Sequence, residues 1–167
     1  MTPADSILIL TTGGTIDKQY FDALSQYQIT DTVVTKLLSI ARVTHPYVIQ
    51  EVLRKDSIDL TDEDRARIVE HVIRASCPRI VITHGTDTMT VTAQALSQVH
   101  DKTIVLTGAL APARFSESDA AFNLGMAFAT AQTASKGVYI TINGSVFRGD
   151  EIVKDRERGR FVLKHNP

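Results

Sequence analysis

The feature that most constrains the fold is a series of short, uninterrupted apolar runs separated by segments with helical periodicity. The first run reads Ser-Ile-Leu-Ile-Leu-Thr-Thr over residues 6–12. A continuous run of this kind is typical of a strand buried on both faces, whereas a strand with one wet face alternates. Six strands are predicted in this way: residues 6–12, 47–53, 79–83, 103–107, 138–142 and 161–163. The more amphipathic run at 47–53 suits a position nearer an edge.

Helical patterns fill the segments between these strands. They are predicted at residues 32–42, 61–73, 88–99 and 118–135. Thr61 and Asp64 have the spacing of a capping box, in which each side chain satisfies a free N–H group of the first turn. Strands that alternate with single helices indicate right-handed crossovers and a mostly parallel sheet covered on both faces. The predicted fold is therefore a single three-layer α/β/α domain over residues 1–167, Rossmann/flavodoxin-like, with residues 145–163 forming a hairpin appended to the sheet.

Composition and charge narrow the functional classes. Hydrophobic residues make up 43% and charged residues 22% of the chain, and the net charge is −1. No electrostatically driven nucleic-acid or membrane partner is indicated, and the dense charges at 150–160 alternate in sign, as in a solvated turn. The start lacks a basic region and its apolar run is too short for a signal peptide or a span, so a cytoplasmic protein is expected. The lone Cys77 is interpreted as structural filler.

The end of the first strand carries the first candidate motif. Residues 11–15 read Thr-Thr-Gly-Gly-Thr. Two glycines after a buried strand allow a tight turn and close approach of a ligand to the backbone, and the hydroxyl of Thr15 can then project into a cleft. Neither a phosphate-loop nor a dinucleotide fingerprint is present. The alternative is a Gly-Gly turn with a surface threonine.

The end of the third strand carries the second motif, Thr-His-Gly-Thr-Asp-Thr at residues 83–88. Thr86 and Asp87 are predicted at a helix N-terminus, where free N–H groups and the helix dipole favour an anion. The alternative is that one of them merely caps the helix. His84 is interpreted as a packing histidine rather than a catalyst.

Taken together, the two motifs resemble the signatures of the bacterial-type L-asparaginase family. The resemblance rests on residues 12–16 and 82–89, with support from 107–112, 122–124 and 149–154. It covers essentially the whole chain, in order and with family-like spacing. It implies an amidohydrolase that cleaves L-asparagine to L-aspartate and ammonia and that needs neither a cofactor nor a metal. No metal-binding cluster or cofactor-binding fingerprint is visible in the sequence.

The resemblance also implies residue roles. Thr15 matches the nucleophile, Thr86 the second active-site threonine, and Asp87 and Lys154 the residues that accompany it. A loop tyrosine assists the nucleophile, and Tyr20 and Tyr27 compete for that role. The substrate contacts implied are Ser57 for the carboxylate, Asp87, Gly14, Gly85 and the backbone of Ala109.

The implied chemistry is physically sensible. A threonine hydroxyl is a poor nucleophile at neutral pH and needs a base or a relay. Lys154, if desolvated beside Asp87 and Thr86, could accept a proton through Thr86. Attack by Thr15 would release ammonia and leave an acyl-enzyme for water to hydrolyse, with direct attack by water as the alternative.

The chain departs from the family in two respects. Familiar members are about twice as long, and a C-terminal domain of a neighbouring subunit supplies an acidic group for the substrate's amino group. Ile58 stands where a polar ligand often follows the serine, which leaves Asp87 as the main ligand for the ammonium. One lost charge-assisted contact is worth roughly 1.5–3 kcal/mol, so weaker substrate binding is expected.

Two interpretations of the short length stay open, a naturally short enzyme or one domain of a longer protein. The start at Met1 and the polar ending at residues 164–167 favour the first. An exposed apolar face would favour a homo-oligomer, a dimer or tetramer. The polar loop at 17–30 is long enough to close as a lid. Two other functions are also considered: an amidase for another small amide such as glutamine, and a non-catalytic module that binds asparagine or aspartate.

Overall fold

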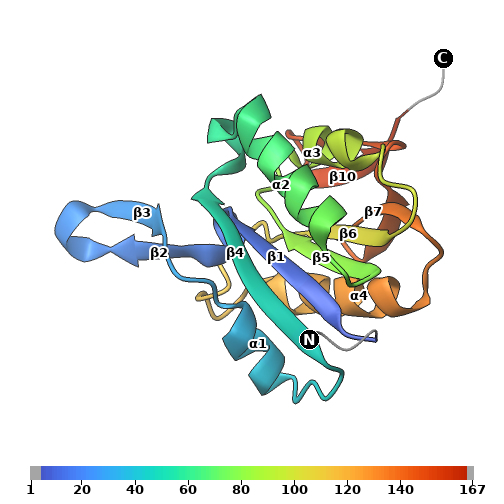
Figure 1. Ribbon diagram of the computed structural model, residues 1–167. Coiled ribbons are helices and arrows are strands. Elements are labelled where there is room, and N and C mark those ends of the chain that lie inside the picture. Colours follow the sequence, from blue (N-terminus) through green and yellow to red (C-terminus); the bar gives the residue numbers. More distant parts are fainter. Residues whose placement is uncertain (1–4, 165–167) are drawn as a thin grey trace.

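The computed structural model describes residues 5–164 and, within them, a central sheet of six strands in the order β4-β1-β5-β6-β7-β8 (Figure 1). All neighbouring pairs are parallel except β7 and β8. The predicted three-layer α/β fold is thereby confirmed. The strands of this sheet are β1 (Ile7–Gly13), β4 (Tyr47–Lys55), β5 (Arg79–Thr83), β6 (Thr103–Thr107), β7 (Gly137–Ile142) and β8 (Ser145–Arg148).

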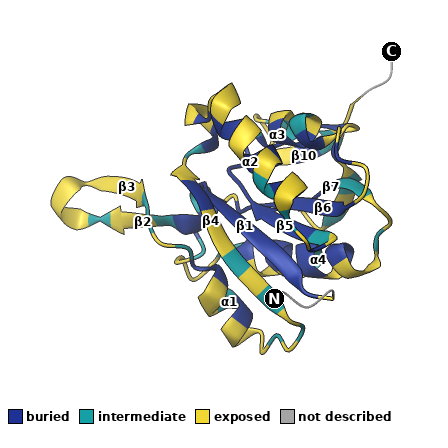
Figure 2. Cartoon of the chain, in the orientation of Figure 1, coloured by how far each residue is buried: buried dark blue, intermediate teal, exposed yellow. Residues whose placement is uncertain are grey.

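Two helices cover each face of the sheet (Figure 1). They are α1 (Val34–Ile40), α2 (Asp62–Arg74), α3 (Met89–Leu96) and α4 (Ala120–Thr133). Alternation along β1 divides the core: Leu8 and Leu10 pack with α2 and α3, whereas Ile7 and Ile9 pack with α1 and α4. The central strands are buried along their length, as continuous apolar runs predict, and the partly exposed β4 forms an edge (Figure 2).

The helix ends follow local sequence signals. The capping box at the start of α2 is present: Thr61 accepts from the Asp64 amide and Asp64 accepts from the Thr61 amide. The other helices are a few residues shorter than predicted. Helix α1 ends at Ile40 because the chain turns at Arg42, whose φ is 52°. No helix within residues 5–164 is long and apolar enough to cross a membrane.

The order of the strands determines where a site can form. Counted along the main parallel strands, β1, β4, β5, β6 and β7 are arranged 2-1-3-4-5, which is the flavodoxin-like order, with its switch point between β1 and β5. At this edge Thr11 pairs in register with Thr83, and Thr83 with Thr107. The turns that follow β1, β5 and β6 therefore emerge side by side. The two threonine motifs flank the switch point.

The C-terminal prediction is corrected by the structure. Residues 145–163 do not form one hairpin: β8 joins the central sheet, whereas β9 (Ile152–Asp155) and β10 (Arg160–Leu163) form a separate two-stranded sheet. The predicted strand at 161–163 thus lies outside the central sheet. Residues 150–160 are not simply a solvated turn either, because Ile152 is completely buried and anchors β9.

The predicted loop at 17–30 is also more regular than expected. Strands β2 (Lys18–Phe21) and β3 (Gln26–Ile29) form an antiparallel hairpin, in which Tyr20 pairs with Tyr27. The hairpin projects away from the body of the domain and is largely exposed (Figures 1 and 2). Residues 1–4 and 165–167, and with them Met1 and most of the polar ending, lie outside the described range.

Candidate active site

Three backbone turns meet at the switch point with almost no space between them. A Cβ placed on Gly14 would lie 2.5 Å from the Gly85 nitrogen, and a Cβ on Gly85 would lie 2.7 Å from Oγ of Ser57. Gly14 also has a φ of 86° and a ψ of −176°, a conformation that is essentially restricted to glycine. Close contact between the glycines brings Thr15, Thr86 and Ser57 to one place.

Thr86, Asp87 and Lys154 form a hydrogen-bonded group at this place. The Lys154 ammonium donates to Oγ1 of Thr86 at 2.7 Å and to Oδ1 of Asp87 at 2.8 Å. The Lys154 side chain is 14% exposed and that of Asp87 is 36% exposed, so the ammonium is the more shielded partner of the pair. The N-cap position of α3 is occupied by Thr88, whose side chain makes no capping hydrogen bond. Neither Thr86 nor Asp87 therefore serves as the helix cap.

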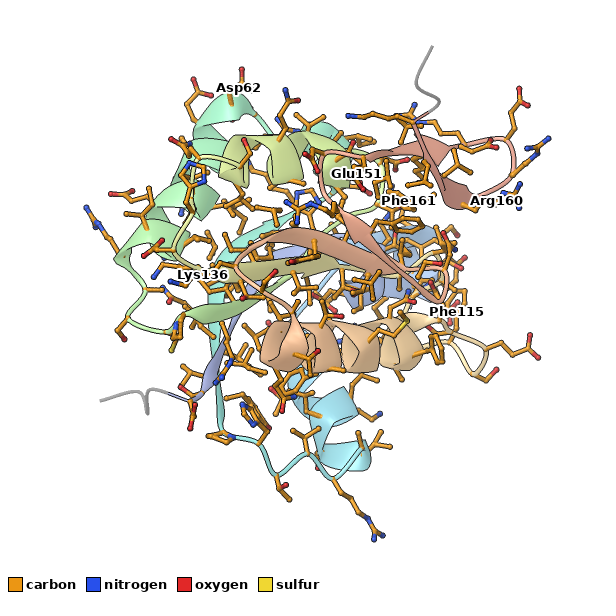
Figure 3. All side chains as sticks on the ribbon, turned by 90° about the vertical axis from the view of Figure 1, so that its right-hand side faces the viewer. Asp62, Phe115, Lys136, Glu151, Arg160 and Phe161 are labelled. Carbon is orange, nitrogen blue, oxygen red and sulfur yellow. The ribbon has the colours of Figure 1, made fainter. Side chains whose placement is uncertain are left out.

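Lys154 reaches Thr86 because strand β9 is held against the domain. Ile152 and Lys154 are two residues apart and share one face of the strand, and Ile152 is fully buried in the core beside α3. Phe161 on β10 is also buried, and its amide donates to the Asn143 side chain at 2.9 Å. In Figure 3, Phe161 lies toward the same end of the molecule as Phe115, and Lys136 lies at the other end.

Thr15 begins the 3-10 turn Thr15–Asp17 and is partly exposed. Within residues 5–164 its hydroxyl has no hydrogen-bond partner. It borders a pocket of about 210 Å³ whose other lining residues are Lys18, Tyr27, Pro112 and Phe115. A free hydroxyl in an open pocket is available to a substrate.

The two tyrosines occupy different positions relative to this pocket. Tyr27 lines it together with Thr15, and its ring also contacts Phe115 at a centroid distance of 6.0 Å. Tyr20 stacks on Tyr27 at 5.1 Å but does not line the pocket. Of the two tyrosines, Tyr27 is therefore the one that lies beside Thr15 in the pocket.

Ser57 is buried and held firmly. The Thr88 amide donates to the Ser57 hydroxyl at 3.3 Å, and the Thr88 hydroxyl donates to the Ser57 carbonyl at 2.7 Å. The Ser57 hydroxyl keeps its own hydrogen for a further acceptor. Ile58, by contrast, is 64% exposed.

A fourth turn, the one after β6, also meets the site. A Cβ on Gly108 would lie 2.2 Å from the His84 carbonyl, so this turn also packs against the motif after β5. Ala109 follows and is buried. Asp119 holds the turn by accepting from the amides of Leu110 and Ala111 at 3.0 Å.

His84 is a packing residue, as predicted. It is fully buried, its Nδ1 lies 2.6 Å from the Gly85 carbonyl, and its Nε2 lies 2.7 Å from the Thr92 hydroxyl. Because the carbonyl can only accept, Nδ1 carries the hydrogen. Burial lowers the pKa of His84 to about 4, so the ring is neutral near pH 7. Cys77 is likewise buried, as filler would be.

Sequence reasoning missed one pair at the site. Lys18 lines the pocket beside Thr15, and its ammonium lies 2.7 Å from Oδ2 of Asp56, the residue before Ser57. Neither residue has a distinctive sequence signal, because the pair forms between a hairpin and a turn that are far apart in the chain. Within residues 5–164 no cluster of three His, Cys, Asp or Glu side chains could hold a metal ion.

Comparison with known proteins agrees with this geometry. The family model "Asparaginase, N-terminal" matches residues 6–163. The chain belongs to the asparaginase family. An L-asparaginase of Thermococcus kodakarensis is 31% identical over 159 residues, which cover 92% of this chain and 48% of that protein.

One further relative and one solved structure show which kinds of protein this asparaginase-family chain resembles. A glutamyl-tRNA(Gln) amidotransferase subunit of Methanococcus vannielii is 32% identical, over 95% of this chain and 38% of the relative. The crystal structure of L-asparaginase I from Vibrio cholerae matches with a TM-score of 0.85 and 27% identity, over 98% of this chain and 52% of that one. The chain thus spans about half or less of the length of the relatives it matches.

Proposed function

We propose that the chain hydrolyses the side-chain amide of L-asparagine to L-aspartate and ammonia, with Thr15 as the nucleophile. The observation that carries this proposal is the hydrogen-bonded group of Thr86, Lys154 and Asp87 beside the contact between Gly14 and Gly85. An activated hydroxyl needs a neighbouring proton relay, and this group supports such a relay next to the turn from which Thr15 emerges.

The chemistry would proceed in two steps. The hydroxyl oxygen of Thr15 attacks the amide carbon, its proton passes to the relay, and the C–N bond breaks as the nitrogen takes up a proton and leaves as ammonia. Water then attacks the ester, which restores the Thr15 hydroxyl and releases the carboxylate. The Lys154 ammonium donates to Oγ1 of Thr86, so the hydrogen of Thr86 is left to point toward the cleft. Lys154 can accept a proton only after it has lost one.

The developing oxyanion requires preorganised donors. Within residues 5–164 the backbone N–H groups of Thr86 and Asp87 have no acceptor, and both precede the N-terminus of α3. Fixed backbone dipoles of this kind are suited to hold an oxyanion without reorganising.

For the substrate itself we propose that Ser57, Gly14, Gly85 and the Ala109 backbone contact the carboxylate and the amide. Asp87 would face the ammonium, and its exposed fraction of 36% leaves it accessible for that contact.

The test is ammonia release from L-asparagine and L-glutamine by the parent chain and by Thr15→Ala, Thr86→Ala and Lys154→Met. Loss of a nucleophile or its relay costs several orders of magnitude in kcat. Each variant is therefore expected to lose at least about a thousandfold, while circular dichroism shows an unchanged fold. Full activity of Thr15→Ala would contradict the proposal.

Glutamine is the second candidate substrate, because one relative is named as a glutaminase-asparaginase. Initial rates on the two amides decide between them. The exposed Ile58, in a place where the family often has a polar residue, favours a third candidate, a module that only binds asparagine or aspartate. Calorimetric binding of aspartate without ammonia release from any small amide would support that third candidate.

We further propose that the chain works in the cytoplasm as a homo-oligomer. Its lone cysteine is buried and reduced, which suits a reducing compartment. Large apolar side chains are exposed on the β2–β3 hairpin and in the loop after β6, including Leu24, Leu110 and Phe115. Contiguous exposed apolar surface is commonly covered by a partner. Sedimentation velocity across a hundredfold range of concentration tests the oligomer, and a monomer at every concentration would contradict it.

A further inference from the structure

The β2–β3 hairpin is connected to the domain at its base by two different kinds of contact. One is a buried carboxylate: Asp17 accepts from the Val33 amide at 2.9 Å, and its own carbonyl accepts from Thr30 and Arg114. The other is the ion pair between Lys18 on β2 and Asp56. The first contact orders the base of the hairpin. The second connects the hairpin to another wall of the site.

Asp56 belongs to the turn that carries Ser57. Its Oδ1 lies 3.4 Å from the Ile58 amide and caps the 3-10 turn Ser57–Asp59. The side chain thus accepts from the turn on one oxygen and from Lys18 on the other. A shift of Asp56 would move Ser57, because the two residues belong to the same turn. Ser57 is packed tightly against Gly85, so such a shift would also alter that contact.

Lys18 also faces the substrate side, because it lines the pocket that contains Thr15 and Tyr27. The side chains of Lys18 and Asp56 are only 26% and 21% exposed. By comparison, the ion pair between Arg54 and Asp31 has exposed fractions of 42% and 90% and does not line that pocket. The Lys18–Asp56 pair is therefore the more shielded of the two, and it connects the pocket that contains Thr15 to the turn that carries Ser57.

We propose that Lys18 and Asp56 are positioning residues, whose ion pair holds the hairpin wall and the Ser57 turn at the separation that a substrate carboxylate requires. This inference rests on the proposed function and goes beyond it, because it adds two residues that touch neither the amide nor the Thr15 hydroxyl. The electrostatics are consistent: the Lys18 ammonium and the amides of Ser57 and Ile58 together lower the pKa of Asp56 despite its partial burial, so it is charged near pH 7.

The first experiment is steady-state kinetics of the full chain on the better of the two amides. Lys18→Met keeps the aliphatic stem, and Asp56→Asn keeps the acceptor that caps the turn. Both are expected to raise KM about fivefold to tenfold with kcat within twofold, and Lys18→Arg is expected to restore most of the affinity. The double variant should raise KM no further than either single one, because a shared interaction is lost only once.

The matched control is Arg54→Met, which removes the more exposed ion pair with Asp31 by the same kind of substitution. It should leave KM unchanged. Unchanged KM in Lys18→Met and Asp56→Asn, or a fall in kcat alone, would overturn the inference. An equally large rise of KM in Arg54→Met would overturn it as well. The rise would then follow from the loss of any positive charge rather than from the loss of the Lys18–Asp56 ion pair.

A second readout separates this inference from the proposed function. The carboxyl carbon of Asp56 is titrated by NMR in the parent chain and in Lys18→Met. The pKa of Asp56 is expected to rise when its cation is removed, because only burial and the backbone donors remain. His84 is coupled electrostatically to Asp56 and has a pKa of about 4, so its ring is titrated in parallel. If no protein releases ammonia, the proposed function fails, and aspartate binding by calorimetry then decides the ion pair: equal affinity in parent and Lys18→Met overturns it.

Discussion

At several positions of the site the space for a side chain matters as much as its chemistry. Gly14, Gly85 and Gly108 each lie where a Cβ would come within 2.7 Å of neighbouring atoms. Those neighbours belong to the other turns of the site, so the three glycines let the turns after β1, β4, β5 and β6 close on one another. Thr15 and Thr86 directly follow two glycines that are in this contact, Gly14 and Gly85.

Gly14→Ala is predicted to destabilise the domain by about 2–6 kcal/mol. Backbone strain at this conformation costs about 1–3 kcal/mol, and forcing a methyl group against the Gly85 backbone adds a similar cost. Gly125 is the control, because it lies in α4 and a Cβ there meets nothing within 4 Å. Gly125→Ala should stabilise by about 0.5–1 kcal/mol. Urea unfolding measures both, and equal effects of the two substitutions would contradict the packing argument.

His84 makes stability depend on pH. Its pKa falls from 6.5 to about 4 on folding, so below pH 6.5 the unfolded chain binds a proton that the folded chain does not. Stability is therefore complete above the unfolded pKa and is lost as the pH falls toward 4, by about 1.4 kcal/mol per pH unit. The free energy of unfolding should change less steeply with pH in His84→Gln, by this amount. In His100→Gln, which changes an exposed residue, its pH dependence should stay as in the parent chain. Urea unfolding between pH 7 and 4.5 gives the slopes.

Among the elements, the short strand β9 carries one of the candidate site residues. It lies outside the central sheet and brings Lys154 to Thr86 through the packing of Ile152 and Phe161. The β2–β3 hairpin is the second such element, since it brings Lys18 and Tyr27 to the pocket. Two short two-stranded sheets thus complete a site whose base is the parallel sheet.

Ile152→Ala is predicted to affect stability and activity together. Removing this fully buried side chain should cost about 2–4 kcal/mol, and the loosened strand should reduce kcat because Lys154 is two residues away. Val153→Ala is the control, since Val153 is 42% exposed on the other face of the strand. It should change both quantities little. Activity that survives in Ile152→Ala under conditions where it is fully folded would show that Lys154 does not depend on this anchor.

Within residues 5–164 of the whole molecule, helices cover both faces of the sheet. One core cluster lies beneath α2 and α3, the other beneath α1 and α4, and the central strands β1, β5 and β6 between them are buried (Figure 2). The relatives are about twice as long, yet both core clusters are covered by elements of this range.

The chain is accordingly predicted to unfold in one cooperative step. Far-ultraviolet circular dichroism and tyrosine fluorescence should give coincident urea transitions, with a slope of about 1–3 kcal/mol/M; the chain has four tyrosines and no tryptophan. Separate transitions, or strong binding of a dye for exposed apolar surface before unfolding, would indicate that part of the domain needs a partner to complete it.

The buried strands, the helices and the two threonine turns could be predicted from the amino-acid sequence, because each has a local signal. Apolar runs indicate buried strands, Thr61 and Asp64 cap a helix through their own spacing, and glycines mark the tight turns. Placement of both motifs at strand ends also followed from topology. The resemblance, rather than the local pattern, assigned a role to Lys154.

The meeting of distant segments could not be predicted and is seen only in the folded domain. The division of residues 145–163 into β8 and a separate hairpin, the position of Tyr27 rather than Tyr20 at the pocket, and the pairing of Lys18 with Asp56 all depend on contacts between segments far apart in the chain. Such contacts leave no periodicity in the sequence. They are determined by which surfaces pack once the sheet has formed, and the free energy of that packing belongs to the assembled domain.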